Sequence, residues 1–209
     1  MLSPLKWLLI LSFGFSLTSL LFLLRRTFSF GKTSTYADPE GSGTRGIAYA
    51  FGRGMMPWEK ESARKHFISY CAGIIFHISI FGALIYLFLL LIPLDLPATA
   101  LLTLRIILLL GLLCGLGLLI KRAVMPVTRH LSCPDDFGAN IIVDIFLILA
   151  LVNAFAHRLE PLFFLMAIVL FIYIPFGKIR HCFLFFYVRI LFGLFFGRRG
   201  VLPPRTSGM

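Results

Sequence analysis

The sequence predicts an all-α membrane protein: one domain, residues 1–209, built as a bundle of about five transmembrane helices. Three observations lead to this prediction. The chain is 59% hydrophobic and only 14% charged, which is unusual for a soluble domain. Several apolar runs reach the roughly 20 residues that a helix needs to cross a bilayer. The basic residues fall mainly between these runs, as in membrane proteins of defined orientation.

Five segments carry the predicted helices: 7–24, 67–92, 98–120, 138–155 and 162–190. The first resembles a secretory signal. However, Arg25 and Arg26 follow it where a small-residue cleavage site belongs, so we expect a retained helix. Pro175 should kink the last helix, because proline cannot donate the backbone hydrogen bond that the helix needs.

The distribution of positive charge predicts the orientation. The connection 25–66 and the tail 197–209 are basic, and the positive-inside rule places both in the cytoplasm. Seventeen of the 20 Lys and Arg then lie on the cytoplasmic side or in the last helix leading to it, and the N-terminus lies outside. The pattern indicates lipid rather than nucleic acid as the partner of the basic residues, and we expect the location to be the cytoplasmic membrane of a prokaryote.

His77 is the first candidate functional residue, because an imidazole inside an apolar membrane helix is costly and usually functional. Gly73 lies one turn earlier on the same face, which would let a flat ligand such as haem approach the backbone. A purely structural histidine, hydrogen-bonded to a neighbouring helix, is the alternative.

A haem held by two histidines needs imidazoles on different helices at similar depth. His77 in the inner half of its helix and His181 at the inner end of the last helix are the best-matched pair. A two-haem arrangement would pair His66 with His181 and His77 with His157. Its two spacings would be roughly 16 Å and roughly 36 Å at helical rise, which do not match. We therefore expect His66 in the hydrated segment that leads into the helix 67–92, and His157 in an external turn.

Other polar residues admit two interpretations each. Arg105 lies about two turns inside its helix; we expect it to snorkel to the outer interface, although it could hold a haem propionate or a quinone carbonyl. Asp144 is expected to cap its helix or bond between helices, with proton handling as the alternative. The cysteines form no CxxC pair, so no disulfide framework, zinc site or iron–sulfur site is indicated: Cys71, Cys114, Cys133 and Cys182.

Several short segments resemble one family, the membrane cytochrome b subunits typified by the respiratory nitrate reductase gamma subunit and related heterodisulfide reductase and sulfite-reductase-linked subunits. The segments are Ile75-Phe-His-Ile-Ser-Ile80, the Lys121-Arg122 stop, Gly138-Ala-Asn-Ile141 and above all Ile174-Pro-Phe-Gly-Lys-Ile-Arg-His181. The resemblance covers the chain from about Gly73 onward.

The resemblance implies a single haem b ligated by His77 and His181. The nitrate reductase type uses four histidines for two haems. Here Leu87 and Phe163 occupy the positions of the two outer-haem ligands. This departure also puts the family's outer quinone site in doubt, so we expect the quinone headgroup near the inner haem, with Trp58 in the lead-in as a lining residue or as a simple interface anchor.

The resemblance further implies a haem b-containing membrane anchor subunit in a hetero-oligomeric respiratory complex. Such a subunit moves electrons between menaquinone or ubiquinone and a cytoplasmic iron–sulfur subunit, and has no catalytic residue of its own. The basic residues nearest the ligands in sequence are candidates for binding the haem propionates: Lys178, Arg180, Lys65 and Arg64. A non-redox membrane anchor or assembly subunit without haem is the alternative.

Overall fold

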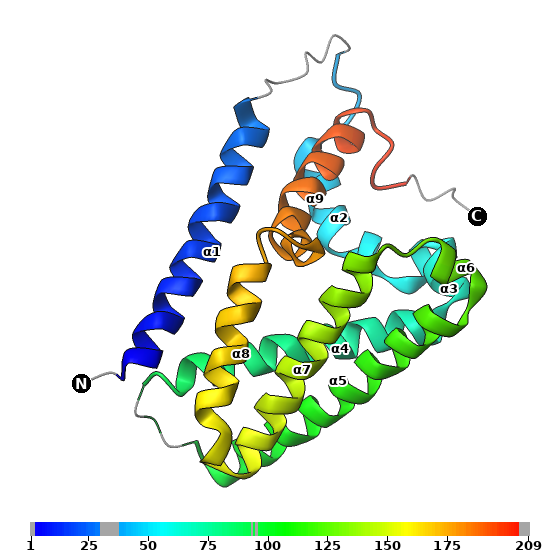
Figure 1. The fold of residues 1–209 in the computed structure, drawn as a ribbon. Coiled ribbons are helices and arrows are strands. Elements are labelled where there is room, and N and C mark those ends of the chain that lie inside the picture. Colours follow the sequence, from blue (N-terminus) through cyan, green and yellow to red (C-terminus); the bar gives the residue numbers. More distant parts are fainter. Residues whose placement is uncertain (1–2, 30–37, 93, 95, 205–209) are drawn as a thin grey trace. The chain divides into compact units, whose positions relative to one another are not determined.

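The fold is known from a computed structural model, which describes residues 3–29, 38–92, 94 and 96–204. The structure is 84% helical, and no strand occurs in these ranges, which confirms the all-α prediction. The longer helices are α1 (Pro4–Ser29), α4 (Phe67–Leu89), α5 (Ala98–Val124), α7 (Pro134–Phe155), α8 (Glu160–Tyr173) and α9 (His181–Arg198) (Figure 1). The shorter elements are α2 (Gly43–Phe51), α3 (Glu61–Lys65), α6 (Pro126–His130), η1 (Arg53–Met55), η2 (Pro57–Glu59), η3 (His157–Leu159) and η4 (Lys178–Arg180).

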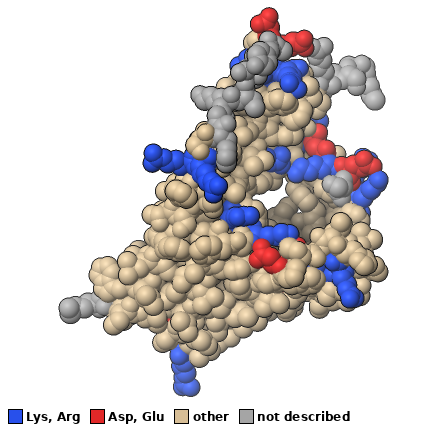
Figure 2. Space-filling view, turned by 45° about the horizontal axis from the view of Figure 1, so that its top comes forward, with Lys and Arg blue, Asp and Glu red and all other residues tan. Residues whose placement is uncertain are grey.

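Five of the helical stretches in the described chain are long and apolar enough to cross a membrane: α1, α4, α5, α7 and the Lys178–Arg198 stretch that contains α9. Their outward side chains are largely Leu, Ile and Phe, and most of the face in Figure 2 carries neither acidic nor basic groups. A surface of this kind suits lipid tails better than water. The chain is therefore a multi-pass membrane protein.

The chain divides into two compact units, and the expected single domain stays a prediction. The first unit comprises residues 1–19 and 68–179, and the second comprises residues 20–67 and 180–209. Helix α1 contributes its first part to one unit and its last part to the other. Each unit therefore draws on segments far apart in the sequence, which no local pattern of residues could reveal.

Large apolar side chains hold the first unit together. Four of them are almost fully buried: Tyr86, Leu87, Phe146 and Phe163. The Phe163 ring packs against the rings of Tyr86 and Phe146, with centroids 6.0 Å and 5.2 Å away. Because lipid tails are as apolar as these side chains, close packing rather than escape from water favours such contacts in a bilayer.

Two glycines let neighbouring helices approach α5 closely. A Cβ atom at Gly111 would lie 1.9 Å from the Ser79 hydroxyl oxygen of α4, and one at Gly115 would lie 2.1 Å from an Asp144 carboxyl oxygen of α7. The Ser79 hydroxyl donates to the Ile107 carbonyl at 2.6 Å. Small residues one turn apart thus bring polar groups of α4 and α7 against the α5 backbone, as is common in membrane bundles.

The second unit is built around the contact of α2 with α9, which lie side by side in Figure 1. A Cβ atom at Gly46 would lie 2.1 Å from the Gly193 carbonyl oxygen and 2.6 Å from the Gly197 Cα. The two backbones therefore touch directly. The connection 25–66, expected as a polar loop, contains α2 and α3 among its described residues. Helix α2 packs on α9 through glycines rather than through apolar side chains, so its contact gave no signal in the sequence.

The predicted helix 162–190 is two helices. Helix α8 ends at Tyr173, and α9 begins at His181 and continues to Arg198. Pro175 lies in the break, as expected for a residue that disrupts helices. Gly177 packs under the Tyr173 ring, where a Cβ would lie 2.3 Å from a ring carbon, and its N–H donates to the Tyr173 carbonyl at 2.9 Å. Proline and glycine together turn the expected kink into a full interruption.

Candidate functional site

His77 lies on α4 with its side chain exposed, beside the buried ring of Phe76. Its Nδ1 atom is 2.6 Å from the Gly73 carbonyl oxygen. A carbonyl oxygen can only accept, so Nδ1 carries the proton in this contact. Metal-binding histidines are commonly held in this way, by a hydrogen bond from the nitrogen that does not bind the metal.

Gly73 differs from Gly111 and Gly115 of the first unit and is as open as Gly14 and Gly117. A Cβ atom added there would meet nothing within 4 Å, whereas one at Gly111 or Gly115 would overlap a neighbouring side chain. Gly73 is therefore not explained by helix packing inside this unit. The space beside its backbone, one turn from the His77 ring, is compatible with the flat ligand predicted for this face.

His181 is the first residue of α9 in the second unit, and its side chain is exposed. Arg180, also exposed, directly precedes it. The structure thus places the two predicted ligands at the surfaces of different units, each on a membrane helix. In the described part of the chain, no group of three or more His, Cys, Asp or Glu side chains could hold a metal ion by itself.

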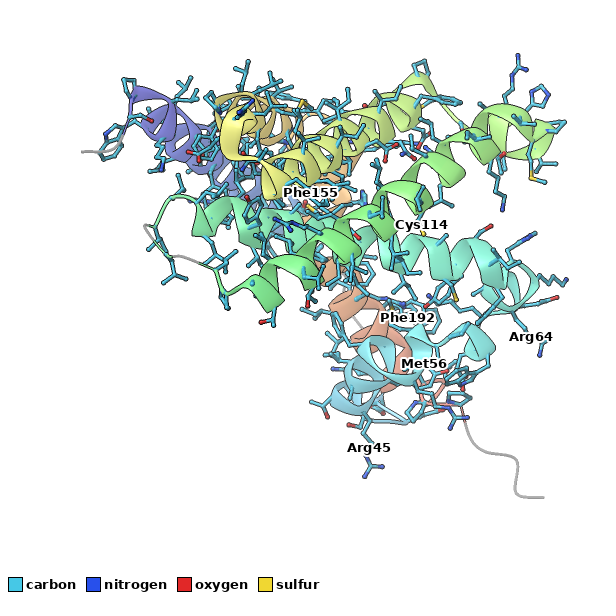
Figure 3. The ribbon with its side chains drawn as sticks, turned by 90° about the horizontal axis from the view of Figure 1, so that it is seen from below. Arg45, Met56, Arg64, Cys114, Phe155 and Phe192 are labelled. Carbon is cyan, nitrogen blue, oxygen red and sulfur yellow. The ribbon has the colours of Figure 1, made fainter. Side chains whose placement is uncertain are left out.

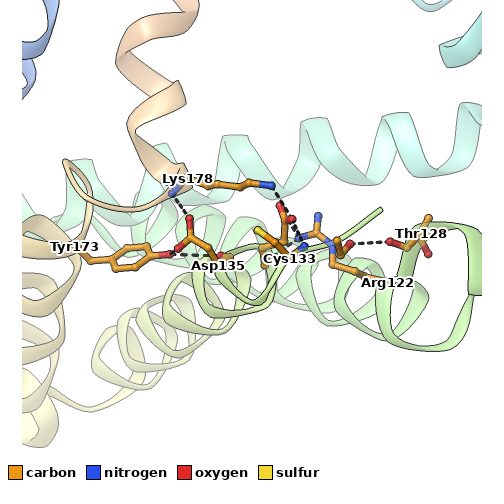
Figure 4. A network of polar contacts seen from close by, with 8 residues as sticks. Arg122, Thr128, Cys133, Asp135, Tyr173 and Lys178 are labelled. Atoms are coloured by element: carbon orange, nitrogen blue, oxygen red, sulfur yellow. Dashed lines mark hydrogen bonds and ion pairs between the residues drawn. The ribbon is translucent and has the colours of Figure 1, made fainter. Parts of the chain in front are cut away.

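Lys178 is engaged by the start of α7. Its ammonium group lies 2.6 Å from Asp136 Oδ2, and its backbone N–H donates to Asp135 Oδ2 at 2.8 Å (Figure 4). A lysine that pairs with a carboxylate is a weaker candidate for a propionate than one without such a pair. The prediction for Lys178 as a cofactor ligand is untested, but the structure assigns this residue a structural role as well.

The same network joins the α8–α9 break to the α5–α7 connection. The Tyr173 hydroxyl donates to Asp135, and Arg122 Nη1 donates to the Asp136 carbonyl at 2.7 Å. The Cys133 N–H donates to Asp136 Oδ2 at 2.9 Å and so caps α7. These contacts fix the Ile174–Gly177 segment, which lies within the motif that carries the family resemblance.

Trp58 belongs to η2 in the second unit, where its side chain is 63% exposed. The turn around it is held by Glu59, which accepts from the Tyr49 hydroxyl at 2.8 Å and pairs with Arg53 at 2.5 Å. These two donors lower the pKa of Glu59, and burial together with the Glu59 contact raises the pKa of Tyr49. An indole presented in this way suits an interface anchor and equally a lining residue for a ring-shaped ligand.

Arg105 has a structural role that the sequence did not predict. Its Nε and Nη2 atoms donate to the Ala154 carbonyl at 2.9 Å and 2.6 Å, and its guanidinium lies 4.5 Å from the ring centroid of Phe155, labelled in Figure 3. Arg105 thus caps the C-terminal end of α7, where a positive charge is favoured, and the expected snorkelling stays a prediction.

Asp144 and Asn153 are, with Asn140, the buried polar residues of α7. Asp144 Oδ2 accepts from Asn140 Nδ2 at 2.8 Å, and Asn140 also approaches the Gly115 carbonyl at 3.4 Å. Asn153 donates to the Tyr86 hydroxyl at 3.1 Å. The expected interhelical bond therefore involves Asn140, whereas Asp144 bonds within its own helix.

The two positions where an outer haem would be ligated lie in the packed core. Leu87 and Phe163 are both completely buried, and each is surrounded by other apolar side chains of the first unit. His66 is exposed between α3 and α4. The side chain of His157 lies outside the described part of the structure, so the prediction of an external-turn residue is untested.

Arg189 was missed by the sequence analysis, although it lies inside the apolar run of α9. It approaches Met55 Sδ at 2.5 Å, and its guanidinium lies 5.6 Å and 6.0 Å from the ring centroids of Phe185 and Phe192. Burial and the charge of Arg189 lower the pKa of Lys60. The signal was present: an arginine flanked by aromatics four residues before and three residues after it on a helix.

The chain was compared with protein-family models, with curated proteins and with solved structures, and none of them matches it.

Proposed function

We propose that the protein is a haem b-containing membrane subunit that transfers electrons between a membrane quinone and a peripheral iron–sulfur protein. The observation that carries the proposal is the His77 side chain. It is exposed on a membrane helix, and its Nδ1 is held by the Gly73 carbonyl at 2.6 Å, so that Nε2 would be the nitrogen that binds the metal. The resemblance to membrane cytochrome b subunits at His77 and His181 supports the same conclusion.

In this proposal His77 and His181 would bind the haem iron, and the haem would supply a centre that accepts and releases single electrons. Gly73 leaves room beside α4, the helix that carries His77. Arg180, which is exposed and directly precedes His181 in the sequence, would provide positive charge for a propionate. The family resemblance points to a cytoplasmic iron–sulfur partner. The net charge of +11 would favour its docking if that partner is acidic.

A non-redox membrane anchor is the second candidate. The same His77–Gly73 hydrogen bond favours it, because a bond to the carbonyl four residues earlier is also how a polar side chain satisfies itself in an apolar helix. In that case the exposed imidazole would serve contact with another protein in the complex.

The pyridine haemochrome assay on the purified full-length protein separates these candidates. We expect one haem b per chain, lost in His77→Ala and in His181→Ala. The matched controls are His66→Ala and His130→Ala, which remove exposed histidines outside the membrane helices and should keep haem. Wild-type protein without stoichiometric haem, or haem retained in both ligand variants, overturns the redox proposal.

The quinone part has its own test. A quinone-analogue inhibitor should shift the haem spectrum, and Trp58→Ala should abolish the shift while leaving haem content unchanged. Trp7→Ala is the control, because Trp7 on α1 is the other tryptophan of the chain and is similarly exposed, at 56% against 63%. Equal shifts in wild type and Trp58→Ala would assign Trp58 to interface anchoring.

A further inference from the structure

Asp144 is buried in the first unit and is 3% exposed. It lies on α7, one of the helices long and apolar enough to span a membrane. Its Oδ2 accepts one hydrogen bond, from Asn140, and its Oδ1 has no hydrogen-bond partner. A carboxyl group in this position is outside the haem-binding proposal and requires its own explanation.

Two uncharged groups lie against the Asp144 carboxyl: the Asn140 amide on α7, which donates to it, and the backbone of Gly115 on α5. The Phe76 ring of α4 faces the same glycine. None of the ion pairs within the described residues involves Asp144. An ionised carboxylate with one hydrogen bond and no counter-ion is strongly disfavoured in an apolar interior, whereas the neutral acid is not.

The geometry also indicates which oxygen carries the proton. Asn140 Nδ2 faces both Asp144 Oδ2 and the Gly115 carbonyl, which can only accept, so the amide acts as donor to Oδ2. Oδ2 is then the carbonyl-like oxygen of the acid, and Oδ1 carries the proton. Oδ1 faces the backbone of Gly115 on α5, and any side chain at position 115 would displace this oxygen.

A polar stripe connects this acid to one end of α7. Asp136, Asn140 and Asp144 follow one another at four-residue spacing and therefore share one face of the helix. Asp136 lies in the first turn, where it pairs with Lys178 and Arg122. Four residues after Asp144 the stripe reaches Ile148, so it ends at Asp144 and does not continue along the helix.

We propose that Asp144 is an intramembrane proton-binding site, neutral at rest with its proton on Oδ1 and loaded from the start of α7 along the Asp136–Asn140 stripe. Loading transfers one proton from hydronium to the carboxylate, giving the acid and water, and no electron moves. Proton binding at Asp144 does not require haem, so it can be tested independently of the proposed electron-transfer function.

Infrared difference spectroscopy of the purified full-length protein in lipid, exchanged between H₂O and D₂O, tests this proposal. At neutral pH we expect a C=O band of a protonated carboxylic acid that shifts in D₂O and on carboxyl-¹³C labelling of aspartate. The band should be lost in Asp144→Asn and kept in Asp136→Asn. The chain contains nine Asp and Glu residues in all, which makes the assignment tractable.

Two further measurements complete the test. Asp144→Glu should move the band from the aspartate-labelled to the glutamate-labelled sample, which covers the case that Asp144→Asn does not fold. Asn140→Leu should slow the H/D exchange of the band by interrupting the stripe. Wild-type protein without a protonated carboxyl at neutral pH overturns the proposal, and a band that appears only when sodium is removed would assign a metal cation instead.

Discussion

The two units of this protein differ in what fills their helix contacts: side chains fill them in the first unit, even beside Gly111 and Gly115, whereas backbone meets backbone in the second. In the first unit, α4, α7 and α8 interlock through large rings such as Phe146 and Phe163. In the second, α2 meets α9 through glycines, and the Gly46 and Gly193 backbones touch with no side chain between them. The difference shows that apolar side chains identify a membrane helix in the sequence. The closest approach between two helices depends instead on glycines, which have no side chain.

The difference matters most for α2, which has only nine residues. A helix this short is marginal by itself in water. The backbone contact with α9 and the hydrogen bond from the Gly41 N–H to the Arg198 carbonyl, at 3.0 Å, supply the missing support. Helices α4, α5 and α7 of the first unit, with 23, 27 and 22 residues, are long enough to form in a bilayer before they pack.

Gly46→Ala should have the largest effect. The added Cβ meets the Gly193 and Gly197 backbones, which cannot rotate away as a side chain can, and we expect a loss of about 3 kcal/mol in the free energy of unfolding. Thermal unfolding in detergent measures the loss, and hydrogen exchange of the α2 amides localises it.

Two glycines of α5 sharpen this prediction. Gly115→Ala meets only side chains, Asp144 and Phe76, and should cost about 1–2 kcal/mol because these can shift. Gly117→Ala meets nothing within 4 Å and should be neutral or stabilising by up to about 1 kcal/mol. Equal losses for Gly46→Ala and Gly115→Ala would contradict the contrast between backbone and side-chain contacts.

The Arg105 cap should have the next effect within the first unit. Arg105→Gln shortens the side chain and removes the charge, so the Ala154 carbonyl loses its donors and the free energy of unfolding should fall by about 2 kcal/mol. Arg105→Lys, measured in the same way, keeps the charge at the helix end and should lose less. A larger loss in the lysine variant would mean that the cap is not electrostatic.

The smallest expected effect is in the second unit, at Glu59. Tyr49 and Arg53 hold the pKa of Glu59 below its ordinary value of 4.5. A lowered folded-state pKa means that the stabilisation is present above the ordinary pKa and is lost as the pH falls through the folded-state pKa. The unfolding midpoint should therefore decline in acid more steeply in wild type than in Glu59→Gln.

Parallel acid titrations of the two proteins by circular dichroism would detect this difference. Glu61→Gln is a suitable control, because Glu61 and its partner Lys65 are largely exposed and Glu61 should contribute little. Identical slopes for wild type and Glu59→Gln would show that the Tyr49–Arg53–Glu59 contact does not stabilise this unit.

The sequence alone predicted four of the membrane helices closely. The runs 67–92 and 98–120 correspond to Phe67–Leu89 and Ala98–Val124, because length, apolar content and flanking charge are local properties of the chain. It did not predict α2, whose nine residues are too few for a membrane span and whose packing partner lies about 150 residues later. It also joined α8 and α9, since the effect of Pro175 depends on how Tyr173 and Gly177 pack around it.

For the candidate sites, the sequence by itself determined which residues were chemically unusual: His77, Arg105 and Asp144 are polar groups in apolar helices. The tertiary structure decided what the last two contact. Arg105 caps α7, and Asp144 lies against Gly115 without a counter-ion. The physical reason is that burying a polar group in a membrane costs free energy at any position, so residue type alone reveals it. The partner of that polar group depends on which backbone the tertiary structure brings within hydrogen-bonding distance.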